Sequence, residues 1–429
     1  MDKRFLQEAL KEEPGIMSFA YPHARSWEPI NPKIIEERWR NSAGDAILYI
    51  HSPYCFSKCG YCGFYSVPLS SDSRTAQDQT VRSILKEAKR YADYFKGKIK
   101  AVDIGGGTPN ALAPAAFALL TDVIELFKLD NTCESSVELY PVSDIDDYLE
   151  ICEYTRINRV SIGIQDFNDE VLRVCTRKHT TSDALNAYDL TRRRFGNINL
   201  DLMLGLPRQT LKSWEKTIDI LLELHPENAT INPFSCRHKG ISLYKARQNG
   251  ELPSLPQMIE MWDLARQKLS NAGYTQTSRS NFFRTKPNAY EALIADSAPR
   301  IALGPKAVGL VSDITYMNEQ LDQGYNRSVR KRNLPIFSGL ILDEEEQMHS
   351  WIVYKLLSMK IPRAEFQQKF GRDIVNEFSE LVYMLNEEGL ITTTDDEIVL
   401  TPRGVYYTSL LQRCFFSEPV KAMKAGVRK

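Results

Sequence analysis

Three cysteines stand close together in the first part of the chain, and their spacing restricts what they can bind. Cys55, Cys59 and Cys62 follow the pattern Cys-x3-Cys-x2-Cys. A structural zinc site takes four ligands, commonly as two close pairs, and a disulfide framework takes an even number of cysteines in a small secreted chain. Three neighbouring thiolates instead suit one cubic iron–sulfur cluster. Three ligands leave the fourth iron open, so it can bind a substrate or a cofactor.

Composition excludes several classes of protein. The 429 residues allow two or three domains, and 43% hydrophobic with 25% charged residues is ordinary for a globular soluble protein. A formal net charge of -1 gives no overall attraction to nucleic acid or membrane. No apolar run approaches the roughly 20 residues of a spanning helix, and the charged start has no signal-peptide core. We therefore expect a cytoplasmic protein in a reducing compartment.

The other cysteines are scattered, and we expect each to be a small buried apolar side chain. They are Cys133, Cys152, Cys175, Cys236 and Cys414.

Six apolar segments alternate with segments of helical periodicity. The predicted strands are residues 46–51, 99–104, 136–140, 159–165, 198–204 and 229–234. This rhythm is typical of parallel βα units with right-handed crossovers. The predicted fold is therefore α/β, with a partial (βα)6 barrel related to the TIM barrel. We divide the chain into an N-terminal arm (1–45), the barrel (46–240), a barrel extension and connecting region (241–340) and a C-terminal domain (341–429).

Polar or glycine features follow the strands at their carboxyl ends. They are the cysteine loop, the glycines at 105–107, Glu138, Gln165, Asp201 and the pair Ser235 and Cys236. In parallel α/β folds this edge of the sheet binds ligands, and glycines let the backbone approach a ligand closely. The predicted site therefore lies at the carboxyl edge of the barrel.

The C-terminal domain shows helices, two short strands at 389–392 and 398–401, and a final helix. This order predicts a winged-helix-like α+β unit, a type that often binds DNA. Its surface is acidic, so we expect no nucleic acid as a partner. The acidic residues are Glu377, Glu380, Glu387, Glu388, Asp395, Asp396 and Glu397.

The cysteine triad followed by Gly-Gly-Gly-Thr-Pro at 105–109 resembles the radical S-adenosylmethionine (SAM) superfamily. Residues 48–55, 161–168, 199–207 and 303–305 further resemble the coproporphyrinogen III dehydrogenase-like family. The similarity runs from about residue 45 to the C-terminus. In that family the winged-helix-like end covers the active site instead of reading DNA.

The resemblance implies two kinds of cofactor. The cysteines would hold a [4Fe–4S] cluster, and the open iron would chelate SAM, which an electron cleaves to a 5′-deoxyadenosyl radical. Several members hold a second SAM. Matching residues would contact the first SAM at Tyr49, Gly106, Glu138 and Val308, and the second at Tyr61, Gly107, Thr108, Gln165, Arg177, Asp201 and Ser235.

Alternatives stay open for three of these positions. Arg177 either pairs with a carboxylate or is a solvated loop charge. Asp201 either accepts from ribose hydroxyls or is a capping or turn residue. Cys236, with His238 nearby, either donates hydrogen or protons as a candidate catalytic residue or simply packs. No other catalytic residue is predicted.

Departures from the family pattern guide the choice of reaction. The dehydrogenases carry a further cysteine where this chain has Phe64, and the heme chaperones carry a His-Asn-x-x-Tyr-Trp motif where it has Asn288, Ala289 and Tyr290. Residues 62–65 resemble the anaerobic heme-degrading radical methyltransferases and, with other segments, the class C methyltransferases. We therefore expect radical methyl transfer to an sp2 carbon, as methylation or cyclopropanation.

Other functions remain as alternatives. These are oxidative decarboxylation of a porphyrinogen propionate, a heme-binding chaperone without radical turnover, and a zinc-binding or DNA-binding module. The expected partners are a small-molecule substrate, either a natural-product intermediate or a tetrapyrrole, and an electron donor such as flavodoxin or ferredoxin. We expect a monomer that does not bind membranes.

The cluster hypothesis predicts the effect of one substitution. Cys59→Ala should remove the visible iron–sulfur absorption and all SAM cleavage, because a cubic cluster needs each of its three thiolates here. Absorption spectra of anaerobically reconstituted protein and an assay of 5′-deoxyadenosine measure both effects. SAM cleavage that survives in this variant would contradict the hypothesis.

Overall fold

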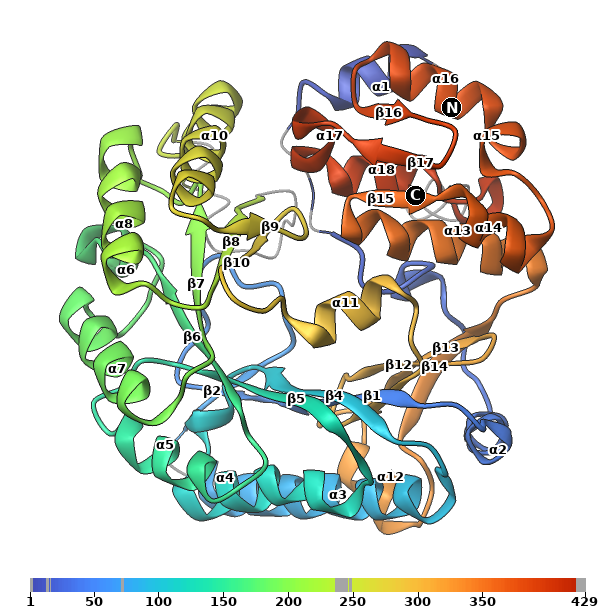
Figure 1. The fold of residues 1–429 in the computed structure, drawn as a ribbon. Helices are drawn as coiled ribbons and strands as arrows, with labels where there is room; N and C mark the ends of the chain where they lie inside the picture. The colour runs from blue at the N-terminus through green and yellow to red at the C-terminus, as the bar shows by residue number, and fades with distance from the viewer. Residues whose placement is uncertain are drawn as a thin grey trace.

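A single twelve-stranded sheet organises most of the molecule (Figure 1). The computed structural model describes residues 3–12, 15, 17–70, 73–235, 246 and 249–421. The strand order is β14-β13-β12-β11-β1-β4-β5-β6-β7-β8-β10-β9, and two smaller sheets lie outside it. Within these described ranges, no helix combines the length and the hydropathy that crossing a membrane requires.

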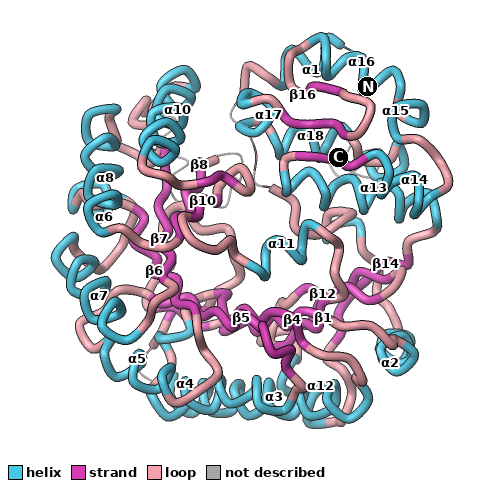
Figure 2. Tube along the Cα trace, viewed as in Figure 1, coloured by secondary structure: helices cyan, strands magenta, loops and turns pink. Residues whose placement is uncertain are grey.

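Six neighbouring strands of this sheet run parallel and form the predicted partial barrel. They are β1 (Ala46–Ser52), β4 (Ile99–Gly106), β5 (Leu129–Leu139), β6 (Arg159–Gln165), β7 (Ile198–Leu204) and β8 (Asn228–Pro233). Helices α3 (Ser73–Tyr94), α4 (Pro114–Thr121), α5 (Ile145–Glu153), α7 (Thr181–Arg194) and α8 (Leu211–Leu224) cover the outer face (Figure 2). Strands covered by helices in this way have continuous apolar sequences, and these sequences made the barrel predictable.

One boundary differs from its prediction. The sequence predicts a helix over 114–129 and a strand from residue 136. The structure instead ends α4 at Thr121 and starts β5 at Leu129. The first part of β5 is polar, including Asp130, Thr132 and Glu134, so its strand character does not show in the apolar pattern. Pairing with β4 stabilises it instead, with Ile99 opposite Leu129.

The sheet extends beyond the six strands on both sides. β11 (Arg300–Leu303) pairs parallel to β1, and β12 (Val308–Val311), β13 (Ile314–Asn318) and β14 (Ile336–Ile341) continue antiparallel. At the other side, β10 (Asn281–Phe283) and β9 (Thr275–Gln276) pair antiparallel beyond β8. The edge strands β14 and β9 do not pair with each other. We call this open side of the barrel the seam.

Two parts of the chain lie across the seam (Figure 1). One is α11 (Ala289–Ala295). The other is the C-terminal unit, in which β15 (Lys360–Pro362), β17 (Glu397–Leu400) and β16 (Ile391–Thr393) form an antiparallel sheet. Its helices are α13 (Glu344–Lys355), α14 (Arg363–Phe370), α15 (Ile374–Glu377), α16 (Ser379–Glu387), α17 (Pro402–Tyr406) and α18 (Thr408–Cys414). The strand after α13 and the later hairpin complete the predicted winged-helix-like arrangement.

The N-terminal arm packs against both the C-terminal unit and the barrel extension. Its helices are α1 (Lys3–Ala9) and α2 (Pro32–Asn41). The Tyr407 hydroxyl donates to the Leu10 carbonyl (2.8 Å), and the Gln412 side chain bonds both backbone groups of Ser18 (2.8 and 3.0 Å). Farther along, Glu28 and Gly339 exchange backbone hydrogen bonds beside β14. The arm therefore joins the C-terminal unit to the β14 side of the seam.

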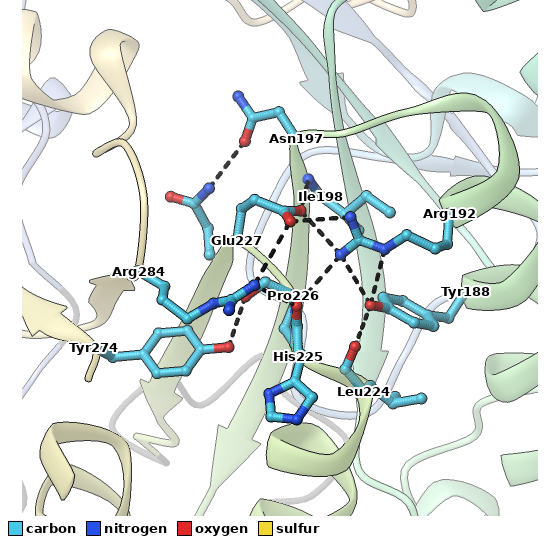
Figure 3. A network of polar contacts seen from close by, with 11 residues as sticks. Tyr188, Arg192, Asn197, Ile198, Leu224, His225, Pro226, Glu227, Tyr274 and Arg284 are labelled. Carbon is cyan, nitrogen blue, oxygen red and sulfur yellow. Dashed lines mark hydrogen bonds and ion pairs between the residues drawn. The ribbon is translucent and has the colours of Figure 1, made fainter. Parts of the chain in front are cut away.

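A carboxylate fixes the amino ends of β7 and β8 (Figure 3). Glu227 accepts two bonds from the Arg192 guanidinium of α7 (2.9 and 3.0 Å) and one from the Ile198 amide (3.1 Å). Nearby, the Tyr274 hydroxyl donates to the Pro226 carbonyl (2.6 Å). This paired arrangement joins a covering helix to two strands at the end of the barrel opposite the cysteine loop.

A second buried carboxyl positions the loop that follows β11. Glu87 of α3 has no exposed surface and accepts from the Gly304 amide (2.9 Å), the Asn318 side chain (2.8 Å) and the Tyr325 hydroxyl (2.5 Å). A Cβ at Gly304 would lie 2.4 Å from the His51 carbonyl oxygen of β1. Glu87 therefore holds the loop directly against the strand that leads into the cysteines.

Removing Glu87 should destabilise the fold. Glu87→Ala leaves several buried donors without this acceptor, and we expect the free energy of unfolding to fall by about 3 kcal/mol. Chemical denaturation measures it. Asp78→Ala, which removes an exposed carboxylate from the same helix, is the matched control and should change little. An equal loss in both variants would contradict this role.

Glu87 also predicts a pH dependence. Burial raises its pKa from 4.5 to about 7, and its hydrogen bonds only partly oppose this. The folded state holds the proton more tightly than the unfolded chain, so the contribution of Glu87 is complete below about pH 4.5 and is lost as the pH rises through about 7. Glu87→Ala should remove that part of the pH dependence.

Candidate active site

The cysteine loop is closed at its base by a short parallel pair of strands. β2 (Tyr54–Cys55) follows β1 directly and pairs with β3 (Val67–Pro68). The Val67 amide donates to the Pro53 carbonyl (2.7 Å), and the Leu69 amide donates to the Cys55 carbonyl (3.0 Å). The loop between them therefore leaves the barrel edge and returns to it.

The three cysteines of this loop differ in burial. Cys55 and Cys59 are buried and Cys62 is partly exposed. The Cys62 amide donates to the Cys59 carbonyl (3.1 Å), and the Gly60 amide donates to the Cys175 carbonyl (3.0 Å). These bonds hold the loop both internally and against the segment after β6.

The described residues contain no group of three His, Cys, Asp or Glu side chains able to hold a single metal ion. Ligands of one zinc ion lie about 2.3 Å from it, so their sulfurs must converge on one point. A cubic cluster makes a different demand, because each cysteine binds a different iron. In the part of the chain that the structure describes, the three thiols of this loop do not converge on one point, so they fit the cluster better than zinc.

The glycines at the end of β4 lie so close to neighbouring groups that a side chain at any of them would clash. A Cβ would lie 2.6 Å from the Glu138 carboxylate at Gly105, 2.6 Å from the His51 ring at Gly106, and 2.4 Å from the Tyr54 carbonyl at Gly107. Gly106 also has φ +109°, which side chains disfavour. The β4 edge can therefore lie directly against β1 and the cysteine loop.

Three predicted site residues are among the less buried positions of the barrel strands. Tyr49 is the single partly exposed residue of β1, Asp201 is partly exposed in β7, as is Met203, and Gln165 is partly exposed at the end of β6, as is Gly163. The Glu138 side chain is exposed to solvent although protein surrounds it on all sides. These residues therefore line a solvent-accessible space inside the barrel.

Carboxyl groups that protein surrounds dominate the electrostatics of this space. Burial raises the pKa of Asp103 and of Glu291 to about 7, and it also raises the pKa of Glu138 and Asp201. Mutual repulsion adds to the effect at Asp103, Glu138 and Glu291, and Arg159 opposes it at all four. Carboxyls in this setting favour a cationic ligand, and SAM carries both a sulfonium and an ammonium group.

A neutral histidine connects β1 to the cysteine loop. Burial lowers the pKa of His51 to about 4. Its Nδ1 lies 3.0 Å from the Tyr49 hydroxyl, and its Nε2 lies 3.0 Å from the Tyr65 carbonyl. The ring thus aligns Tyr49, which the sequence predicts to contact SAM, with the far end of the cysteine loop.

Arg177 is not a solvated loop charge. Its guanidinium carbon lies 4.0 Å from the centre of the Tyr140 ring, and its Nη1 donates to the Cys59 sulfur (3.8 Å). A further bond from its Nη2 goes to the Gly163 carbonyl. Arg177 therefore places positive charge beside a cluster cysteine.

Asp201 and Gln165 occupy positions consistent with ligand contact. Asp201 lies within β7 and accepts from the side chains of Ser161 (2.8 Å) and Asn199 (2.9 Å), so it is not a capping or turn residue. Gln165 has φ 73°, an unfavourable conformation for a residue with a side chain. Such strain at the carboxyl end of β6 is typical of functional sites.

The remaining predicted positions lie around the same edge. Ser235 is buried, and its hydroxyl has no hydrogen-bond partner in the described structure. Tyr61 packs with Val171, Leu206 and other apolar residues. Val308 begins β12 and is partly buried. Cys236 and His238 lie outside the described residues, so the proposed catalytic role of Cys236 stays a prediction.

The sequence analysis assigned no role to four residues that line or flank the barrel space. Asp103 gave a usable signal, since an aspartate stands inside an otherwise apolar strand. The sequence around Arg159, Glu291 and Tyr290 gives no sign of a role, because only long-range packing brings these residues to the barrel space. The Tyr290 ring centre lies 6.5 Å from that of Tyr49.

Two family models match parts of this chain. The radical SAM superfamily model matches residues 49–221, which include the cysteine loop and the first five barrel strands. The model described as the HemN C-terminal domain matches residues 342–407, within the winged-helix-like unit.

Individual proteins match over most of their length. The heme chaperone HemW of Bacillus subtilis is 28% identical, covering 83% of this chain and 95% of that protein. The oxygen-independent coproporphyrinogen III oxidase of Salmonella typhimurium is 24% identical, covering 86% and 84%. The solved coproporphyrinogen III oxidase (HemN) of Escherichia coli has the same fold, with a TM-score of 0.81, 22% identity and coverage of 93% and 97%.

These comparisons correct the expected reaction. The prediction of radical methyl transfer to an sp2 carbon, by methylation or cyclopropanation, is wrong, as is the assignment to the class C or heme-degrading methyltransferases. The relatives reported above are named as a heme chaperone and as coproporphyrinogen III oxidases. Phe64, on which the choice depended, is 67% exposed on the cysteine loop and therefore says little about the substrate.

Thr108 should tune the cluster. Its hydroxyl lies 3.1 Å from the Cys55 sulfur and 2.7 Å from the Gly107 carbonyl. When Cys55 is a thiolate ligand it has no proton of its own, so the single hydroxyl proton of Thr108 can turn from the carbonyl to the sulfur. A donor at a ligand sulfur stabilises the reduced cluster, so Thr108→Val should lower the reduction potential by roughly 40 mV, the one-electron equivalent of a hydrogen bond of about 1 kcal/mol. A potentiometric titration of the reconstituted cluster measures the change. Thr108→Ser keeps the hydroxyl and should retain the wild-type potential, and a shift of equal size in both variants would exclude the hydrogen bond as the cause.

Proposed function

Because the chain belongs to the radical SAM superfamily and carries a HemN-type C-terminal domain, we propose that it oxidatively decarboxylates a propionate side chain of a porphyrinogen. Its cofactors are a [4Fe–4S] cluster and SAM. The substrate class and the reaction are the proposed part. This reaction takes the place of the methyl transfer predicted from the sequence, and the same two cofactors can drive it.

One observation supports this proposal more than any other. The radical SAM and HemN C-terminal regions occur together in one chain, at 49–221 and 342–407. A relative named as a heme chaperone aligns with 83% of this chain, and one named as a coproporphyrinogen III oxidase aligns with 86%. A radical SAM region alone is compatible with many reactions, so the pairing narrows the choice to tetrapyrroles.

The residues at the carboxyl edge have defined parts in this proposal. Cys55, Cys59 and Cys62 hold the cluster in a loop closed by β2 and β3. The glycine edge of β4, which contains the predicted SAM contacts Gly106 and Gly107, lies directly against the base of that loop. Glu138 would accept a hydrogen bond from the SAM ammonium group. The SAM carboxylate suits a basic side chain of the barrel edge, and the ribose hydroxyls suit an acidic one.

The cofactors supply the oxidising chemistry when bound: in net terms R–CH2–CH2–COO⁻ and SAM become R–CH=CH2, CO2, methionine and 5′-deoxyadenosine. The chain positions and shields the reactants. Tyr49 and its partner His51 form one wall, and the low pKa of His51 keeps that wall uncharged. The arm, α11 and the C-terminal unit restrict access of water from the seam.

Product analysis tests this proposal. Reconstituted protein with reductant, SAM and coproporphyrinogen III should release CO2 and yield a porphyrinogen lighter by the elements of CO2 and H2 for each reacted propionate. Methionine and 5′-deoxyadenosine should form in equal amounts to the vinyl groups. The Cys59→Ala variant should form neither the vinyl product nor 5′-deoxyadenosine. Cleavage of SAM with the porphyrinogen recovered unchanged would contradict the proposal.

A heme-delivering chaperone is a second candidate. The observation that favours it is the Bacillus subtilis relative, 95% of whose length aligns with this chain. The chaperone hypothesis predicts tight, stoichiometric heme binding and no turnover of SAM. A heme titration together with the 5′-deoxyadenosine assay separates the two functions.

A further inference from the structure

Arg279 lies at the seam and contacts three separate parts of the chain. It stands in the turn between β9 and β10, and 4% of its surface is exposed. Its Nη1 donates to the Gly15 carbonyl of the arm (3.0 Å) and to the Ser409 hydroxyl of α18 (3.4 Å). The guanidinium is therefore held between the barrel, the arm and the C-terminal unit.

The charge of Arg279 has no counterion within the described ranges. No ion pair joins it to a carboxylate there, and its two hydrogen-bond partners are neutral. Burial lowers the pKa of the group to about 10. A buried guanidinium without a counterion is costly, so its presence calls for a compensating ligand.

One edge of this guanidinium is free. Its Nε has no hydrogen-bond partner, and no described residue accepts from its Nη2. These two nitrogens point the same way and can bind both oxygens of a carboxylate. Arg38 uses the same pair of nitrogens on Asp313 (3.0 and 3.2 Å). Arg279 therefore presents the binding edge while its Nη1 fixes its orientation.

The other inward arginines have their charge compensated or their edge occupied. Arg159 lies among the carboxyls of the barrel interior. Arg192 forms a bidentate pair with Glu227 (Figure 3). The Nη2 of Arg300 already donates to the Phe19 carbonyl (3.1 Å). The Nε atoms of Arg159 and Arg300 also have no partner among the described residues, so Arg279 differs from these three in having there neither a carboxylate nor an acceptor for Nη2.

The turn that carries Arg279 is connected to the inner face of the barrel. The Ser280 carbonyl accepts from the Ile231 amide of β8 (2.7 Å), and Asn281 donates to the Glu291 carboxylate. The hydroxyls of Ser280 and Ser235 are buried and have no partner among the described residues. Unsatisfied polar groups in one region are expected where a polar ligand binds.

We propose that Arg279 binds a carboxylate of the substrate through Nε and Nη2, and so fixes the macrocycle at the seam. This assignment rests on the proposed function. Coproporphyrinogen carries four propionates around its rim, and those that are not reacting need counterions. The sheet is unclosed at the seam, so a macrocycle held in the barrel with its rim toward the seam would bring a propionate to Arg279.

Ligand binding tests the assignment separately from turnover. The probes are coproporphyrin III, which is the stable oxidised macrocycle, and its tetramethyl ester, which lacks every carboxylate. Full-length, cluster-loaded protein should bind the acid more tightly than the ester in fluorescence titrations. R279Q should weaken binding of the acid by roughly tenfold to hundredfold and leave binding of the ester unchanged.

Matched variants distinguish recognition from structure. R284Q removes a partly exposed arginine from the same hairpin and should retain both affinities. If R279Q does not fold, R279K carries the test, because it keeps the charge and loses the two-nitrogen edge. It should then weaken binding of the acid alone.

The outcomes separate the two hypotheses. Equal weakening of acid and ester, or no change in either, would overturn the role of Arg279 while the tetrapyrrole proposal stands. Failure of the wild-type protein to bind either macrocycle would overturn the proposed function, and the role of Arg279 with it.

Discussion

The rest of the structure depends on the contact between the glycine edge of β4 and the chain that leaves β1. The Gly107 amide donates to the Ser52 carbonyl (2.7 Å), and the Thr108 amide donates to the Tyr54 carbonyl (2.7 Å). A side chain at Gly107 would collide with the Tyr54 carbonyl. Through this contact the base of the cysteine loop becomes part of the barrel edge. A flexible loop could not hold a cluster at a defined distance from residues on six strands.

Burial and charge divide the molecule into two electrostatic regions. Inside the barrel, carboxyls outnumber their one buried arginine partner, and this arrangement suits the cationic parts of SAM. At the seam, Arg279 is a buried cation without a carboxylate in the described structure. A substrate whose carboxylates lie on its rim would meet the cationic region first. The two regions thus separate recognition of the cofactor from the proposed recognition of the substrate.

The open sheet explains why so much of the chain lies outside the six parallel strands. An unclosed barrel exposes two edges and its interior to water. Here α11, the arm and the C-terminal unit cover that side, and hydrogen bonds such as Tyr407 to Leu10 and Glu28 to Gly339 tie them together. This arrangement gives the winged-helix-like unit a purpose other than binding DNA, since it covers the barrel.

The sequence by itself determined the six parallel strands, and it predicted the cysteine triad as a cluster site and the carboxyl edge of the barrel as the place where ligands bind. Each depends on local spacing: three cysteines in one loop, apolar runs of strand length, and glycines directly after a strand. Tertiary structure decided what local spacing does not contain. Glu291, Arg159 and Arg279 acquire their chemistry from partners far away in the chain, because burial and counterions depend on packing. The prediction of the reaction failed for the same reason: Phe64 is adjacent to the cysteines in sequence, but its side chain is 67% exposed in the fold.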